Sequence, residues 1–261
     1  MHLFEILMPF FFMFLVGSCI GSFLNVLIDR LPNDKNVFLG RSHCDNCKKN
    51  LSPLELFPIF SFLVLKGKCK NCETVLKKRM FFVEIATGAL FICYYSFFLF
   101  YALPLSFFLY ILLVTCLFIP IIFTDLEYGI IPDQLVIFLA VVISFYTILI
   151  SGQNIANHFL TGTITFIVFL LLFVVTKGKG MGFGDVKLSF VLGLFLGFPN
   201  ILVGFYGAFL TGAGVSIILV LWGRKNFKKD TIPFGPFLVF STLFSFFFGE
   251  KIITAVLRYF S

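Results

Sequence analysis

The sequence is poor in charge: Asp, Glu, Lys and Arg together make up only 13% of its 261 residues, about half the share in an ordinary soluble domain. It also lacks the period-two pattern of outer-membrane barrels. Apolar residues instead make up 59% of the chain, and its mean hydropathy is +1.04. Runs such as 6–28 and 135–150 approach or exceed the roughly 20 residues with which a helix crosses a bilayer. A soluble globular fold is therefore excluded.

The N-terminus has neither the basic start nor the small-residue cleavage site of a secretory signal peptide. We therefore expect the first apolar run to remain as a span, and we predict an all-α polytopic membrane protein with about eight transmembrane helices. The predicted spans are 6–28, 80–101, 105–124, 133–151, 158–176, 186–198, 200–222 and 236–249. The tail after Glu250 is expected to be amphipathic or interfacial.

Positive charge is divided unevenly between the two sides that these spans define. With the N-terminus outside, the cytoplasmic segments are 29–79, 125–133, 177–187 and 223–235. They hold 18 of the 20 Lys and Arg residues, and only Lys251 and Arg258 lie outside. Retention of Lys and Arg in the cytoplasm is what orients membrane proteins. This distribution accounts for the net charge of +7 without a nucleic-acid partner.

The predicted domain division follows from this topology. Residues 1–28 form the first transmembrane helix, 29–79 a cytoplasmic domain, and 80–261 the membrane-embedded core. The cytoplasmic piece has about fifty residues, too few to bury much of a core by itself. It is therefore expected to need an additional stabilising cross-link.

Two cysteine pairs in this loop can supply that cross-link. They are Cys44-x2-Cys47 and Cys69-x2-Cys72, a spacing that resembles a four-cysteine zinc site. Two disulfides are the alternative, but the predicted topology puts the loop in the reducing cytosol, which favours zinc. Its role would be structural, because four thiolates leave no coordination position for water. The remaining cysteines lie in predicted spans and are interpreted as small hydrophobic residues: Cys19, Cys93 and Cys116.

Carboxylates at membrane depth are costly and mark functional sites by default. Asp125 ends an apolar run and Asp185 follows the glycine-rich stretch 180–184, both at predicted cytoplasmic ends of spans. Two carboxylates a few ångströms apart share one proton, so one can act as a base and the other as an acid in peptide hydrolysis. The glycines Gly182 and Gly184 would let a substrate backbone approach Asp185.

Structural interpretations of these carboxylates stand beside the catalytic one. Asp185 can serve simply as the N-cap of the helix that follows it, and for Asp133, after Pro132, an N-cap is the preferred interpretation. Glu127 is expected to face solvent. An ion-coupled or proton-coupled transporter would also use carboxylates such as Asp125 and Asp185.

Several short segments of the chain, taken together and in order, resemble those of the type 4 prepilin peptidases, which are bifunctional leader peptidases and N-methyltransferases. The matching segments are Gly21–Val26, Arg30–Pro32, both cysteine pairs with 65–69, Arg79 with 83–84, Asp125–Asp133, Gly182–Lys187 and Pro233–Phe237. The resemblance covers nearly the whole chain. One departure is Asp45, where the family often has proline after the first cysteine.

The resemblance implies that Asp125 and Asp185 are the catalytic aspartates, the second in a GxGD signature shared with presenilin-like proteases. It implies cleavage of prepilin or pseudopilin leaders after a glycine, at the cytoplasmic face of a bacterial inner membrane, in a pilus, competence or type II secretion system. A basic leader would be recognised by carboxylates such as Glu84, Glu127 and Asp133.

The resemblance further implies methylation of the new N-terminus with S-adenosylmethionine, with Glu55, Gly67 and Lys68 as candidate residues. A glycine-rich Rossmann fingerprint is absent, so the sequence does not indicate how the methyl donor is held. Rival interpretations are a presenilin-like intramembrane protease without methylation, the transporter, and a non-enzymatic scaffold. The small residues Gly17 and Gly21 would either dimerise the first span or pack within one molecule.

Overall fold

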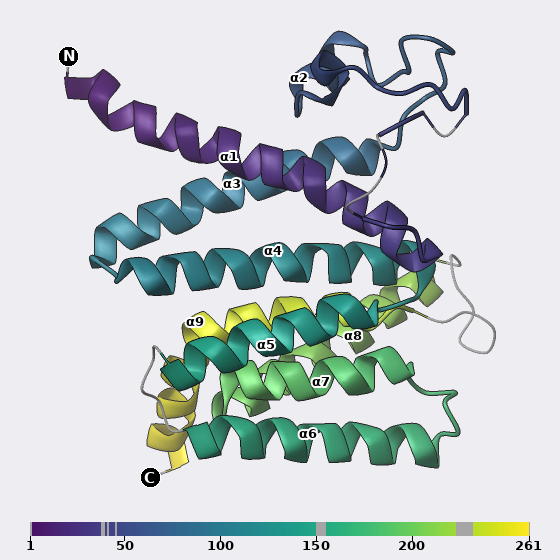
Figure 1. The fold of residues 1–261 in the computed structure, drawn as a ribbon. Helices are drawn as coiled ribbons and strands as arrows, with labels where there is room; N and C mark the ends of the chain where they lie inside the picture. Colours follow the sequence, from purple (N-terminus) through teal and green to yellow (C-terminus); the bar gives the residue numbers. More distant parts are fainter. Residues whose placement is uncertain are drawn as a thin grey trace. The chain divides into compact units, whose positions relative to one another are not determined.

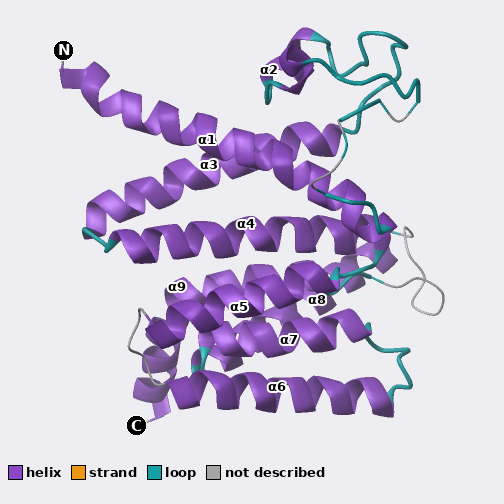
Figure 2. Ribbon diagram, in the orientation of Figure 1, coloured by secondary structure: helices purple, strands orange, loops and turns teal. Residues whose placement is uncertain are grey.

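The computed structural model describes residues 2–37, 40, 42–44, 46–149, 155–222 and 232–260, and these residues form helices and loops (Figures 1 and 2). The long helices are α1 (His2–Arg30), α3 (Lys78–Tyr101), α4 (Leu105–Tyr128), α5 (Asp133–Leu149), α6 (Ile155–Val175), α7 (Phe183–Leu196), α8 (Asn200–Leu221) and α9 (Gly235–Phe260). Three short elements lie between α1 and α3: η1 (Leu31–Asn33), η2 (Pro53–Leu56) and α2 (Phe60–Val64). Within the described ranges, β-structure is limited to two isolated bridges.

Each predicted span coincides with a helix, which confirms the all-helical membrane class. Six of the described helices are long and apolar enough to cross a bilayer, namely α1, α3, α4, α6, α8 and α9. Helix α5 has 17 residues and α7 has 14, so the number of eight spans stays a prediction. The tail beyond Glu250 continues α9 without a break.

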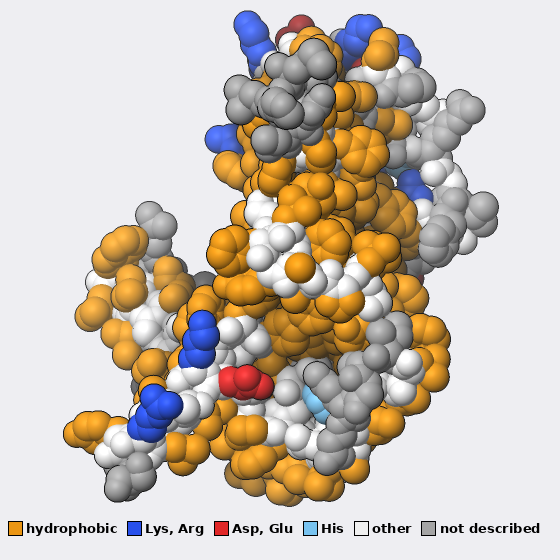
Figure 3. Space-filling view, turned by 90° about the vertical axis from the view of Figure 1, so that its left-hand side faces the viewer, with side chains coloured by type: hydrophobic (Ala, Val, Ile, Leu, Met, Phe, Trp, Pro, Cys, Tyr) orange, Lys and Arg blue, Asp and Glu red, His pale blue; other side chains and the backbone are white. Residues whose placement is uncertain are grey.

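Large apolar side chains remain exposed along most of these helices. On the face drawn in Figure 3, hydrophobic side chains dominate and charged ones are few. Exposed apolar surface of this extent is expected where lipid tails take the place of water.

The chain divides into two compact units, residues 1–120 and 121–261. In the first unit, α1 packs against α3 along a line of small residues. A Cβ atom at Gly17 would lie 2.9 Å from the Cα of Gly88, and one at Gly21 would lie 2.9 Å from the Cα of Glu84. The two glycines of α1 therefore serve packing within the chain.

The ends of α1 and α3 that border the cysteine loop are joined by polar contacts. The Asn25 side-chain amide donates a hydrogen bond to the Met80 carbonyl at 3.0 Å. Asp29 accepts from the Arg79 guanidinium at 2.7 Å and from the Lys77 ammonium at 2.8 Å. These contacts fix where both helices leave the apolar region.

In the second unit, α7 contacts α5, α6, α8 and α9. Ten of its 14 residues are buried, as expected for a helix that is apolar on all sides. Its fit against α6 is close, because a Cβ atom at Gly193 would lie 2.8 Å from the Cα of Gly162. The central position of α7 places its first turn, and with it Asp185, inside the bundle.

Candidate active site

Asp125 lies in the last turn of α4, and its side chain is 7% exposed. Its Oδ2 accepts a hydrogen bond of 2.8 Å from the backbone N–H of Gly235, the first residue of α9. The first N–H groups of a helix have no partner within the helix, so a carboxylate satisfies one of them and is favoured there by the helix dipole. A Cβ atom at position 235 would lie only 2.7 Å from that oxygen. Glycine is therefore required for this contact.

Asp185 lies in the first turn of α7, and its side chain is 6% exposed. Its Oδ2 accepts a hydrogen bond of 3.2 Å from the N–H of Gly182, which is the N-cap residue. Asp185 is therefore not the N-cap, although one of its oxygens helps to cap the helix. Its Oδ1 is buried and accepts no hydrogen bond from any residue that the structure describes. A buried carboxylate oxygen is costly to leave without a partner, so this atom is available for a ligand or substrate.

The two aspartates lie close enough for the charge of Asp125 to act on Asp185. The segment after Asp125 also touches the start of α7, since a Cβ atom at Gly184 would lie 3.1 Å from the Cβ of Ile131. Packing on Ile131 thus accounts for glycine at position 184. The role of Gly182 and Gly184 in admitting a substrate backbone stays a prediction.

Asp133 is the first residue of α5, and the carbonyl of Pro132 accepts the first helical hydrogen bonds, from the N–H groups of Leu135 and Val136. The N-cap prediction for Asp133 is therefore wrong by one residue. Its carboxylate instead forms an ion pair with Lys187 of α7. The same ammonium lies 5.2 Å from the centre of the Phe183 ring. Asp133 therefore helps to hold the first turn of α7, the turn that contains Asp185.

The four loop cysteines form one cluster. The Sγ atoms of Cys44, Cys47, Cys69 and Cys72 all lie within 4.8 Å of one another, and all four are free thiols. The sulfurs of Cys44 and Cys72 are 3.7 Å apart, close to the spacing of about 3.8 Å that tetrahedral zinc with 2.3 Å bonds imposes. That distance is too long for a disulfide, so the geometry fits a divalent metal.

The two cysteine pairs repeat one backbone conformation. The N–H of Cys44 donates to the carbonyl of Lys49 and that of Cys69 to the carbonyl of Thr74, five residues on in each case. The fourth residue after each first cysteine has a positive φ, 58° at Lys48 and 54° at Glu73. The sequence alone did not reveal this repeat, because neither position is glycine.

The thiols of this cluster differ in acidity. The side-chain hydroxyl of Thr74 donates to Cys72 and is the main reason that the pKa of Cys72 is lowered to about 6. Cys47 accepts from the N–H of Lys49, yet desolvation and the neighbouring sulfurs raise its pKa to about 11. Four thiolates therefore need a cation to offset their mutual repulsion.

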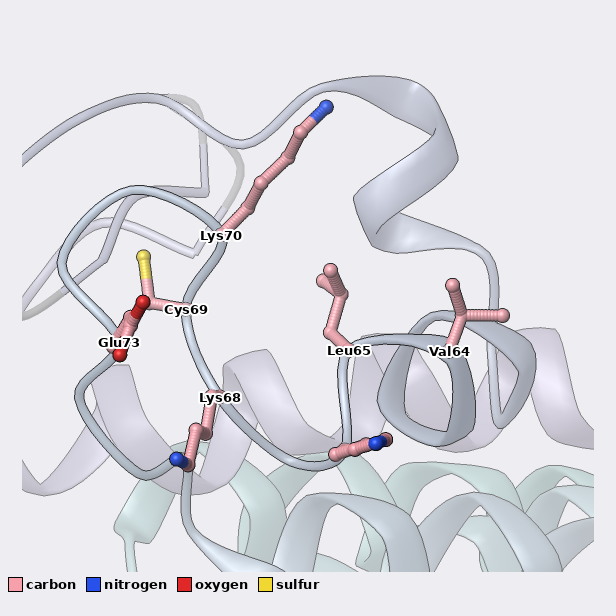
Figure 4. Close-up of a pocket in the computed structure, with 7 residues that line it drawn as sticks. Val64, Leu65, Lys68, Cys69, Lys70 and Glu73 are labelled. Carbon is pink, nitrogen blue, oxygen red and sulfur yellow. The ribbon is translucent and has the colours of Figure 1, made fainter.

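The three methylation candidates occupy different places in the loop. Lys68 lines an open hollow of about 310 Å³ beside the second cysteine pair (Figure 4). Gly67 shapes the turn that precedes it, with a φ of +68° and the Phe62 ring packed on its Cα side. Glu55 accepts a hydrogen bond of 2.8 Å from the Ser52 N–H at the start of η2. The hollow is lined by Val64, Leu65, Lys66, Lys68, Cys69, Lys70 and Glu73.

Comparison with known proteins gives matches along the chain. Residues 15–98 match the bacterial peptidase A24 N-terminal domain, and residues 111–217 match the type IV leader peptidase family. A prepilin leader peptidase/N-methyltransferase of Bacillus subtilis is 30% identical over 246 residues, covering 94% of this chain and 97% of the relative. Proteins of the same name from Legionella pneumophila and Pseudomonas aeruginosa are 29% and 28% identical, over 96% and 94% of this chain and 96% and 92% of their own lengths. No solved structure matches the chain.

Proposed function

Because the chain belongs to the type IV leader peptidase family, we propose that it cleaves the leaders of type IV prepilins or pseudopilins and methylates the N-terminus so exposed. The cut would follow a glycine, at the junction between a basic leader and an apolar helix. Asp125 and Asp185 would be the catalytic pair. The observation that carries this proposal is the buried, unpartnered Oδ1 of Asp185 beside the charge of Asp125.

The hydrogen bonds at the site suggest how the pair would work. Gly235 and Gly182 each donate an N–H to one oxygen of Asp125 and Asp185, respectively, which fixes both carboxyl groups. The ionised member would take a proton from the attacking water, while the protonated member donates its proton to the carbonyl oxygen of the scissile bond. When the intermediate collapses, the C–N bond breaks and the leaving amine receives a proton from the pair.

For the cysteine cluster we propose a structural zinc ion. Four thiolates complete a tetrahedral shell and leave no position for water, so the metal would not take part in hydrolysis. Its role would be to hold together a loop that is too small to fold around an apolar core.

For methylation, the hollow beside the second cysteine pair supports a binding site for S-adenosylmethionine, which would supply the methyl group. The lining is suited to an amino-acid end, because Lys68 can attract a carboxylate and Glu73 an ammonium. Gly67 would act by shaping the turn next to Lys68. Glu55 stays a candidate by resemblance.

We place the protein in the bacterial cytoplasmic membrane, with the cysteine loop and both aspartates on the cytoplasmic side. Support comes from the 18 of 20 Lys and Arg residues that this orientation puts inside. Five of them, Arg41 and the four in segment 223–235, lie outside the described residues. A prepilin helix in the bilayer would then present its leader junction near the last turn of α4 and the first turn of α7.

The test is cleavage of a purified prepilin by the reconstituted protein, followed by mass spectrometry of the product. Wild type should release the leader and add the mass of one methyl group, whereas Asp125→Asn and Asp185→Asn should not cleave. Glu250→Gln, which changes an exposed carboxylate of α9, is the matched control and should cleave normally. Cleavage by both aspartate variants would rule out the proposed pair.

A further inference from the structure

The segment between the two cysteine pairs carries an exposed apolar face that no membrane span explains. Its large hydrophobic side chains are between 41% and 82% exposed: Leu54, Leu56, Phe57, Phe60, Leu63 and Val64. The segment contains η2 and the five-residue α2, so it is far too short to cross a bilayer. Exposed apolar side chains gathered in so short a segment mark a site of interaction.

Two contacts hold this segment beside α3. The backbone N–H of Ile59 donates a hydrogen bond of 2.7 Å to Oε2 of Glu84, and the ring of Phe62 stacks on that of Phe81 with centroids 5.0 Å apart. Glu84 lies six residues into α3, which is about 9 Å along the helix. The two contacts therefore hold the start of α2 at the level of the first turns of α3, and Figure 1 draws α2 above the beginning of α3.

The backbone at Ile59 shows that this position is enforced. Ile59 has a φ of 62°, a conformation that is a genuine outlier for a β-branched residue. Such a conformation persists only when the surroundings impose it. Here Glu84, itself only 7% exposed, supplies the acceptor that holds the Ile59 N–H in place.

Cations follow the apolar face directly. Lys66, Lys68 and Lys70 are exposed, and they line the hollow of Figure 4 together with the apolar Val64 and Leu65. An apolar face bordered by lysines at the level where a span begins is the arrangement of interfacial membrane segments. Lysines in such a border attract anionic lipid headgroups.

We propose that segment 54–64 is a membrane-surface anchor. Its exposed apolar side chains enter the boundary between headgroups and acyl chains in the leaflet on the side of the cysteine loop. Lys66 and Lys70 contact anionic headgroups at its edge. The occupant of the apolar face is thus lipid. This assignment is independent of the peptidase chemistry, and it fixes the height of the cysteine cluster above the bilayer.

The first test places a single tryptophan on the apolar face. The only native tryptophan is removed by Trp222→Phe, and Phe60→Trp is added. In vesicles that contain phospholipids brominated at shallow acyl positions, the fluorescence of the introduced tryptophan should be strongly quenched, and aqueous iodide should have little effect. Val75→Trp in the same background is the matched control, since Val75 is an exposed apolar residue just after the second cysteine pair. It should respond to iodide and not to bromine.

The outcomes separate the possible occupants of the face. Quenching of the Phe60→Trp variant by iodide alone would mean that the face is in water, and quenching by neither agent would mean that protein covers it. Either result overturns the proposal. Leu63→Trp, at another exposed apolar position of α2, provides a second measurement if Phe60→Trp does not fold.

The lysine border is tested by lipid selectivity. With bromine on phosphatidylglycerol instead of phosphatidylcholine, quenching of the Phe60→Trp variant should be stronger at equal mole fraction. Lys66→Gln together with Lys70→Gln should remove this preference. Each lysine is expected to enrich anionic lipid near the segment by up to about fivefold. An unchanged preference would overturn the assignment of these lysines to headgroups.

Discussion

The backbone N–H of Gly235 donates a 2.8 Å hydrogen bond to Oδ2 of Asp125, joining two residues that are 110 positions apart in the chain. The contact ties the last turn of α4 to the first turn of α9 within the second unit. Because a Cβ atom at position 235 would collide with the carboxylate, the hydrogen bond requires glycine at that position.

Gly235→Ala should therefore impair cleavage. The new Cβ atom would lie 2.7 Å from Oδ2 and would force the Asp125 carboxylate to move. A displacement of about 1 Å in a catalytic group lowers kcat by about 100-fold, so we expect a loss of that order with little change in KM. The control is Gly214→Ala, where an added Cβ meets no atom within 4 Å. Normal kcat in Gly235→Ala would argue against a catalytic position for Asp125.

Removing one thiol of the cysteine cluster should release its metal. Cys69→Ser leaves three sulfurs where four lie within 4.8 Å, and we expect the zinc content of the purified protein to fall from about one per chain toward zero. Elemental analysis measures this directly. Cys93→Ser changes an exposed cysteine of α3 and should retain the metal. Equal zinc contents in the two variants would contradict a metal site at the cluster.

Gly193→Ala should destabilise the second unit. A Cβ atom there would lie 2.5 Å from Oγ1 of Thr165 and 2.8 Å from the Cα of Gly162, so α6 and α7 would have to separate. Overpacking of this kind costs about 1–3 kcal/mol in the free energy of unfolding. Thermal unfolding in detergent should show a lower Tm. Gly214→Ala should instead leave the Tm unchanged or raise it, because alanine favours helix over glycine; a matching fall in both variants would contradict the close fit of α6 and α7.

Glu84→Ala should loosen the segment around α2. Without the carboxylate, the Ile59 N–H loses its acceptor at 2.7 Å, which costs about 0.5–1.5 kcal/mol for a hydrogen bond that is only partly buried. Hydrogen exchange of a peptide covering residues 57–65 should become faster. Glu84→Gln keeps the shape and an amide oxygen that can accept from Ile59, so it should have a smaller effect. No change in Glu84→Ala would show that other contacts hold the segment.

Local features of the sequence were sufficient to predict the helices and the cysteine cluster of this protein. Apolar run length is a local property, so 6–28 and 105–124 predicted helices that the structure contains as α1 and α4. The two-residue gap within each cysteine pair is likewise local, and it predicted the cluster. Asp125 and Asp185 could be predicted as candidate site residues because carboxylates next to apolar runs are rare.

The contacts between these helices, in contrast, could not be predicted from local sequence. Helix α7 has only 14 residues, and ten of them are buried by contacts with other helices of its unit. The sequence does not show which helices will be its neighbours. The partners Gly235 for Asp125 and Ile59 for Glu84 lie 110 and 25 residues away. Such hydrogen bonds depend on where separate helices meet, and this is set by packing of the whole unit and not by any local pattern.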